Sequence, residues 1–289
     1  MSTEVEFALC SILAPAAAAL AAAWLLGRIL PDRAAGHYGL AAAVALGFLV
    51  GFALLPDVAL VPKRHWHWLP YLGLAAILGA FGQGTDRWAW QRWLAYLVLA
   101  ILAANQLTPT WAALRPWRIV AIPHLATYLF LLMALLAALP ERLLGRLFVG
   151  LLTATAVAVT AMVIDVSVKF GQVAAIAAAA LSGCTFFILI ARKQTALSSD
   201  SQALAIRGLI PVFVLLVGGM AFVGAIEPRP KIYAMFLAPA APLVLWLFVA
   251  GPLSRLEGWK AVAAQTAAVV AVLAAALAIV VIGRGSDEW

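Results

Sequence analysis

The stretch FGQVAAIAAAALSGCTFFILIA, residues 170–191, contains no charged side chain and is rich in alanine. A helix rises about 1.5 Å per residue, so about 20 apolar residues cross the roughly 30 Å of hydrocarbon in a lipid bilayer. A membrane-spanning β-strand would instead alternate apolar and polar side chains over about ten residues, and this stretch does not alternate. It therefore predicts a transmembrane α-helix, in which backbone N–H and C=O groups pair within the segment.

The composition of the whole chain agrees with this prediction. Of the 289 residues, 66% are hydrophobic and 11% are charged, whereas a soluble domain contains about 25% charged residues. The formal net charge is +7, but the basic residues are scattered through short loops. This distribution favours contact with anionic lipid headgroups over nucleic-acid binding. The lipid bilayer is thus the predicted partner, and no nucleic acid is expected.

Ten apolar runs follow one another along the chain. They predict an all-α integral membrane protein, a polytopic bundle of about ten transmembrane helices. The third run is short, and the fourth reaches spanning length only with a tryptophan-rich segment, so nine spans with one re-entrant run are the alternative. The runs cover roughly residues 7–27, 36–56, 68–83, 91–108, 119–139, 147–165, 170–191, 208–226, 232–251 and 261–283.

The lengths of the loops predict one transmembrane domain over residues 1–289, because no loop is long enough to form a soluble domain. Five runs lie in residues 1–140 and five in residues 141–289. An odd number of helices per half inverts the second half relative to the first, as in many secondary transporters. Basic residues are slightly more numerous in the loops after the odd-numbered runs, which favours both termini outside the cytoplasm. The alanine- and arginine-rich composition favours a bacterial cytoplasmic (inner) membrane.

Titratable side chains near membrane depth are candidates for function because they are expensive to bury. His124 follows Pro123 in the fifth run, where a kink and a titratable ring would form a substrate or proton site. The alternative is a neutral ring bonded to a nearby carbonyl group. Asp165 and Lys169 lie four residues apart between the sixth and seventh runs, which is the spacing of an ion pair on one helix face. At a turn, the same two residues would only cap two helix ends.

Two prolines inside the ninth run give the strongest backbone signal. Pro239 and Pro242 lack N–H groups, so carbonyl groups about one turn earlier lose their helical partners. These are the carbonyls of Met235 and Ala238. Broken helices often form binding sites in transporters, so we predict that this break forms a site with His124 as its titratable neighbour. A plain kink packed by neighbouring helices is the alternative.

The remaining polar and aromatic residues are weaker candidates. Asn105 ends the fourth run and is predicted to line a pathway or to bond between helices. His65 and His67 lie beside Trp66 in a basic loop, but no carboxylate or cysteine cluster completes a metal site there. Interfacial anchoring or contact with headgroup phosphate is favoured. Seven of the eleven tryptophans lie between residues 66 and 117. They predict an interfacial belt, with an aromatic-lined ligand mouth as the alternative.

Sequence motifs of hydrolases, zinc proteases, nucleotide-binding loops and dinucleotide-binding folds are absent from the chain. An enzyme is therefore the least favoured class, and no cofactor or metal is predicted. The two cysteines, Cys10 and Cys184, lie in separate apolar runs and are interpreted as small buried thiols.

The favoured function is a transporter or permease-like carrier of a small or amphipathic molecule. Few charges lie within the runs, which argues against a dense proton relay but permits amphipathic substrates. The alternative is a non-catalytic membrane subunit, scaffold or sensor. A carrier predicts a polar cavity near the membrane midplane between the two halves. A subunit predicts a tight interior and a lipid-facing stripe of small residues.

Overall fold

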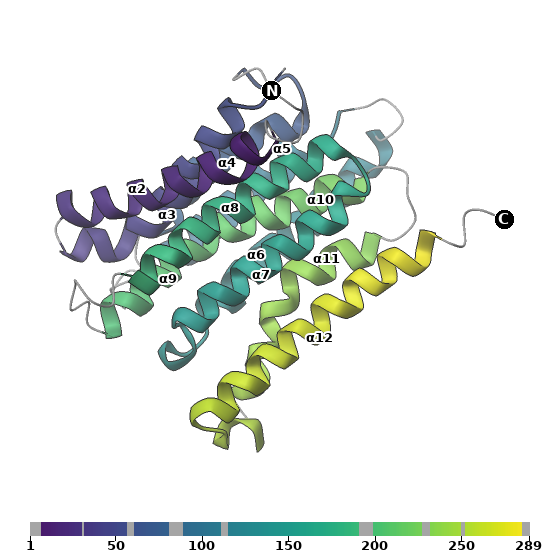
Figure 1. The fold of residues 1–289 in the computed structure, drawn as a ribbon. Helices are drawn as coiled ribbons and strands as arrows, with labels where there is room; N and C mark the ends of the chain where they lie inside the picture. The colour runs from purple at the N-terminus through teal and green to yellow at the C-terminus, as the bar shows by residue number, and fades with distance from the viewer. Residues whose placement is uncertain are drawn as a thin grey trace.

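Long apolar helices lie alongside one another in the computed structural model of the chain (Figure 1). The structure describes residues 7–30, 32–56, 61–80, 89–110, 115–190, 199–226, 232–249 and 252–284, and every regular element in these ranges is helical. The α-helices are α2 (Ala14–Ile29), α3 (Asp32–Ala53), α4 (Leu69–Ala76), α5 (Ala89–Leu107), α6 (Arg115–Ala137), α7 (Arg146–Ile164), α8 (Val168–Ile190), α9 (Ser199–Phe213), α10 (Gly219–Ile226), α11 (Ile232–Ala240) and α12 (Gly258–Arg284).

Shorter segments with tighter or wider helical turns interrupt or flank these helices. Two are π-helical, η1 (Leu9–Leu13) and η8 (Val214–Gly218). The others are 3-10 helices: η2 (His65–Trp68), η3 (Ile77–Ala80), η6 (Glu141–Leu143), η9 (Ala241–Phe248) and η10 (Pro252–Arg255).

The described part of each of the ten apolar runs is mainly helical, but six described helices are long and apolar enough to cross a bilayer. The third run is divided into α4 and η3, and the fourth run, α5, carries polar residues at both ends. The second and ninth runs give shorter apolar helices, Tyr38–Ala53 and Ala234–Phe248. The structure therefore supports six candidate spans and does not confirm ten. The six are Leu9–Ile29, Trp117–Ala137, Arg146–Ile164, Val168–Ile190, Gln202–Ile226 and Gly258–Ile282.

The centre of the bundle is the segment Gln202–Ile226, which is almost entirely buried. It comprises most of α9 together with η8 and α10, and it packs against helices from both halves of the chain. Likewise, α2 and α3 of residues 1–140 pack against α8 and α9 of residues 141–289. The helices of the two sequence halves therefore interleave instead of forming two separate bundles (Figure 1).

Close packing of α3 against its neighbours depends on two glycines one turn apart. A Cβ atom on Gly47 would lie 2.7 Å from the Cβ of Ala19 and from the carbonyl oxygen of Pro15 on α2. A Cβ atom on Gly51 would lie 2.6 Å from Ile176 on α8. The small residues thus permit close helix contact, as in other membrane bundles.

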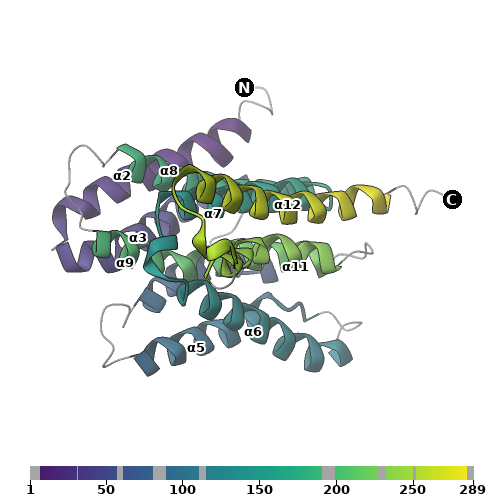
Figure 2. The same ribbon diagram turned by 90° about the horizontal axis from the view of Figure 1, so that it is seen from below.

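The edges of the bundle are formed by α12 and by the α5–α6 hairpin. These elements lie on opposite sides of α11, as the view from below shows (Figure 2). Both present many exposed apolar side chains, for example Val98 and Ile101 on α5 and Val270 on α12. Exposed apolar faces of this kind suit contact with lipid chains.

Candidate functional site

A turn rich in tryptophan and histidine connects α3 to α4. Its helical part is η2, in which Trp66 is only 2% exposed. The Trp66 ring packs edge-on against Phe52 of α3, with centroids 5.9 Å apart, and against Phe170 of α8, at 6.1 Å. Large aromatic side chains contribute much of the energy of such contacts. Trp66 therefore anchors the turn to both helices.

The two histidines of this turn are held neutral. The Lys63 backbone N–H donates a hydrogen bond to Nδ1 of His67 (3.4 Å), so the His67 proton lies on Nε2. Burial lowers the pKa of His67, and the charges of Arg64 and Lys169 lower it further. Burial, followed by His67 and Arg64, lowers the pKa of His65 to about 4. At neutral pH the positive charge here therefore comes from lysine and arginine.

A recess of about 590 Å³ lies beside this turn, at the end of the bundle where α3 and α5 end and α6 begins. Aromatic rings of Trp66, Trp68 and Phe170 form part of its wall. None of the described residues that line it is acidic. Eight charged or polar side chains contribute to the lining, from the turn, the end of α5 with the residues after it, and the start of α6: Lys63, Arg64, His65, Asn105, Gln106, Thr108, Thr110 and Arg118.

Arg118 lies where this recess meets a second, more open hollow between α5 and α6. That groove has a volume of about 570 Å³ and is lined by Asn105, Arg118, Ile119, Ile122 and Pro123. Asn105 and Arg118 line both hollows, so the basic recess continues into a mainly apolar groove. The Nε atom of Arg118 is buried and has no hydrogen-bond partner in the structure. A buried donor without a partner is unfavourable unless something else supplies an acceptor.

No protein-family model matches the chain, and neither the curated protein sequences nor the solved structures contain a match.

In the described part of the chain, no group of three or more histidine, cysteine, aspartate or glutamate side chains is placed to hold a metal ion. His67 is instead buried in aromatic contacts, and its ring centroid lies 4.1 Å from that of Trp66. This arrangement fits the anchoring role expected of the turn.

The structure places His124 on the exposed side of α6. Its Nδ1 donates a hydrogen bond to the Val120 carbonyl oxygen of its own helix (2.7 Å). Pro123 beside it lines the groove between α5 and α6. The pairing of His124 with the proline break therefore stays a prediction, because the described hydrogen bonds between α6 and the broken helix involve other residues of α6, Tyr128 and Leu135.

The hydrogen bond beside the break is made by Tyr128, one turn after His124. At the break α11 gives way to the 3-10 helix η9, and Pro239 and Pro242 are buried. The Tyr128 hydroxyl donates a 2.7 Å hydrogen bond to the carbonyl oxygen of Phe236, and the two rings pack edge-on at 5.0 Å. A side chain of another helix thus donates a hydrogen bond to a carbonyl group of the broken segment, as expected from the cost of an unpaired carbonyl in hydrocarbon. The acceptor is the carbonyl next to Met235, not one of the two carbonyls named from the sequence.

Asp165 and Lys169 lie on either side of the turn between α7 and α8. Asp165 is the C-terminal cap of α7, and Lys169 is in the first turn of α8. The Lys169 Nζ lies 5.9 Å from the Trp66 ring centroid. Lys169 therefore adds positive charge behind the wall of the recess, on the side of Phe170.

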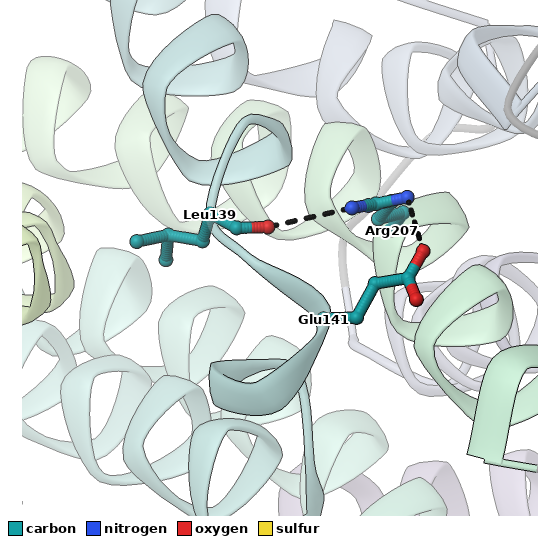
Figure 3. A network of polar contacts seen from close by, with 3 residues as sticks. All are labelled: Leu139, Glu141 and Arg207. Carbon is teal, nitrogen blue, oxygen red and sulfur yellow. Dashed lines mark hydrogen bonds and ion pairs between the residues drawn. The ribbon is translucent and has the colours of Figure 1, made fainter. Parts of the chain in front are cut away.

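An ion pair lies beyond the opposite end of α6. The Arg207 guanidinium on α9 lies 3.3 Å from a carboxylate oxygen of Glu141 and donates to the Leu139 carbonyl oxygen at 3.4 Å (Figure 3). Leu139 follows the last turn of α6, whereas Arg118 is in its first turn. The 23 residues of α6 span about 34 Å, so the recess and this ion pair lie at opposite ends of the helix.

The sequence points to the amides Asn105 and Gln106 at the end of the fourth run and to the basic histidine turn, but not to Arg118 or Tyr128. The tryptophan cluster gave one usable signal, because Trp66 and Trp68 do line the recess. An arginine at the start of an apolar run has the same sequence appearance as an ordinary interfacial residue. Only the fold brings Arg118 beside residues 63–65.

Proposed function

We propose that the protein is a permease-like carrier of an amphipathic molecule that it takes up sideways from the bilayer. One observation carries the proposal: a basic, polar recess at one end of α6 continues into an apolar groove between α5 and α6. The recess lies at the end of the bundle, and apart from Phe170 its lining comes from residues 62–118, so it differs from the midplane cavity between the two halves that the sequence predicts for a carrier. A molecule with a polar head and an apolar chain fits these two environments in this order. The recess (about 590 Å³) and the groove (about 570 Å³) each have a volume in the usual range for ligand sites, about 300–1,000 Å³.

Breaks in two helices support the proposal, because a carrier needs positions at which its helices can bend. The central segment changes from α9 to the π-helix η8 shortly after Pro211, and α11 changes to η9 at Pro239. Non-α turns inside helices often mark hinges and binding sites. In this proposal the ion pair between Arg207 and Glu141 holds the far end closed while the recess is open.

The remaining features of the proposal follow from the sequence. We infer ten spans arranged as two inverted halves in a bacterial cytoplasmic membrane. Besides the six long apolar helices, the four other spans are α3, α4 together with η3, α5, and α11 together with η9. Short and interrupted helices occur in transporters where they line a cavity. The number of spans is tested by reporter fusions after Trp88 and after Pro109, which give opposite locations if α5 crosses.

Reconstitution tests the carrier function directly. The full chain is placed in liposomes that contain a trace of phosphatidylglycerol with a nitrobenzoxadiazole (NBD) label on its acyl chain, and an impermeant reductant measures how fast inner-leaflet label becomes accessible. We expect faster exchange than in protein-free liposomes, and slower exchange with Ile122→Trp, which fills the groove. An exchange rate equal to that of empty liposomes would refute lipid carriage.

A stripe of small residues on α12 favours a second candidate, a membrane subunit. The exposed residues Ala263, Ala267, Ala271, Ala274 and Ala278 recur at helical spacing along α12. Small side chains allow close contact with another transmembrane helix. A photocrosslinking residue at position 271 tests this: one adduct of defined mass in native membranes supports a subunit, and reaction with lipid alone contradicts it.

A further inference from the structure

We infer that the recess binds a phosphate ester of net negative charge, through Arg118 together with Arg64 and Lys63. The inference deepens the carrier proposal and rests on it for its physiological role. It goes further because it assigns the chemical class of the polar head.

The charge around the recess favours an anion. Lys63, Arg64 and Arg118 line it, and the described residues of the lining include no carboxylate. Lys169 adds a fourth positive charge behind the aromatic wall, close enough to lower the pKa of His67. Like charges gathered at one recess repel one another, and this repulsion is relieved when an anion enters.

The donors favour phosphate over a carboxylate. Guanidinium groups bind phosphate oxygens through paired, charge-assisted hydrogen bonds. Arg118 supplies a buried Nε–H without a partner, and the side-chain amides of Asn105 and Gln106 supply further N–H donors to the same recess. Donors that come from three separate elements surround a tetrahedral anion better than a planar one with two oxygens.

The dimensions favour an ester over a bare ion. A volume of about 590 Å³ leaves room for the rest of a headgroup. The groove that begins at Arg118 and runs past Ile119 and Ile122 offers an apolar path for a chain. An anionic phospholipid fits both hollows, whereas a soluble phosphate ester fits the recess alone.

Binding to the purified full chain in an uncharged maltoside detergent tests the inference. Isothermal titration uses three probes: dihexanoyl phosphatidic acid, dihexanoyl phosphatidylcholine and inorganic phosphate. We expect phosphatidic acid to bind and phosphatidylcholine to bind at least about tenfold more weakly. Arg118→Gln is expected to weaken phosphatidic acid binding by about 10- to 100-fold, as for the loss of a hydrogen bond from a charged donor.

Arg92→Gln is the matched control. Arg92 lies at the other end of α5, about 20 Å along the helix from Asn105, and its Nε is also buried without a partner. It changes the same charge in a similar setting, so we expect binding within about twofold of wild type. If Arg118→Gln does not fold, the double variant Lys63→Gln, Arg64→Gln decides, because both side chains are exposed and tolerate substitution.

The outcomes separate the sources of the phosphate. If phosphatidic acid binds much more tightly than inorganic phosphate, and Ile122→Trp removes this difference in affinity, the bound phosphate ester is a lipid. Equal binding of both probes, each lost in Arg118→Gln, supports the phosphate site but refutes lateral uptake. Equal binding of phosphatidic acid and phosphatidylcholine, binding that Arg118→Gln does not weaken, or no binding overturns the inference. Arg118-dependent binding without lipid exchange in liposomes overturns only the carrier.

Discussion

Replacing Tyr128 by phenylalanine removes one oxygen atom from the contact between α6 and the broken helix α11–η9. The ring of Tyr128 packs edge-on against Phe236, with centroids 5.0 Å apart, and a phenylalanine ring keeps this contact. What disappears is the 2.7 Å hydrogen bond to the Phe236 carbonyl oxygen. The variant therefore isolates the hydrogen bond from the packing.

The expected loss of stability is about 1 kcal/mol. Hydrogen bonds between membrane helices contribute about 0.6 kcal/mol on average and up to about 1.7 kcal/mol. The short donor–acceptor distance and the apolar surroundings place this bond in the upper part of that range. The carbonyl also lies beside a proline break, where fewer backbone donors are present to replace the phenol.

Reversible unfolding in mixed micelles of dodecyl sulfate and an uncharged detergent, followed by circular dichroism, measures the effect. Thr160→Val is the control, because the Thr160 hydroxyl donates to the Ala156 carbonyl oxygen of its own helix (2.9 Å). That carbonyl keeps its backbone partner, so we expect the control to lose less than half as much. A Tyr128→Phe variant within about 0.3 kcal/mol of wild type would refute the idea that the phenol stabilises the break.

Three further predictions concern packing and charge. Gly47→Ala forces contacts of 2.7 Å and is expected to lower stability by about 1–3 kcal/mol, whereas Gly39→Ala on the same helix meets open space and is expected to be neutral or slightly stabilising in thermal unfolding. Because the pKa of His65 falls from 6.5 to about 4 in the folded protein, its contribution to stability is present above pH 6.5 and is lost as the pH falls towards 4; the melting temperature of His65→Asn should therefore fall less between pH 7 and pH 4.5. Glu141→Gln should reduce stability by less than about 1 kcal/mol, because Glu141 is largely exposed and its 3.3 Å ion pair with Arg207 is weakened by solvent, and added salt should shrink the difference from wild type.

The helical class of this protein could be predicted because hydropathy is a local property of the sequence. Long apolar runs such as Val168–Ile190 predict both an α-helix and its place in a lipid bilayer. The number of spans could not be fixed in the same way. Leu69–Ala80 is helical but short and changes from α to 3-10 geometry, and whether such a segment crosses depends on its neighbours rather than on its own composition.

The candidate site could be predicted only in pieces. The basic histidine turn and Asn105 were visible because polar residues are rare at the ends of apolar runs. Arg118 was not, since its importance comes from lying next to a turn more than 50 residues earlier in the chain. The proline break was visible too, because Pro239 and Pro242 lack N–H groups whatever the fold. Its hydrogen-bond donor, Tyr128, could not be predicted, because a single tyrosine in an apolar run does not indicate which helix it will contact.

The position of α6 links the separate features of the site. Arg118 lies in its first turn at the recess, Ile122 lines the groove one turn further, Tyr128 bonds to the broken helix, and Leu139 accepts the hydrogen bond of Arg207 beyond its last turn. The first three residues lie on α6 and Leu139 follows it closely, so a change in the tilt of α6 alters the recess, the break and the ion pair together. A ligand shifts such an equilibrium only by as much as it binds one arrangement better than the other. An anion held by Arg118 meets this condition, because the arginine reaches residues 63–65 only while α6 keeps its place beside the turn.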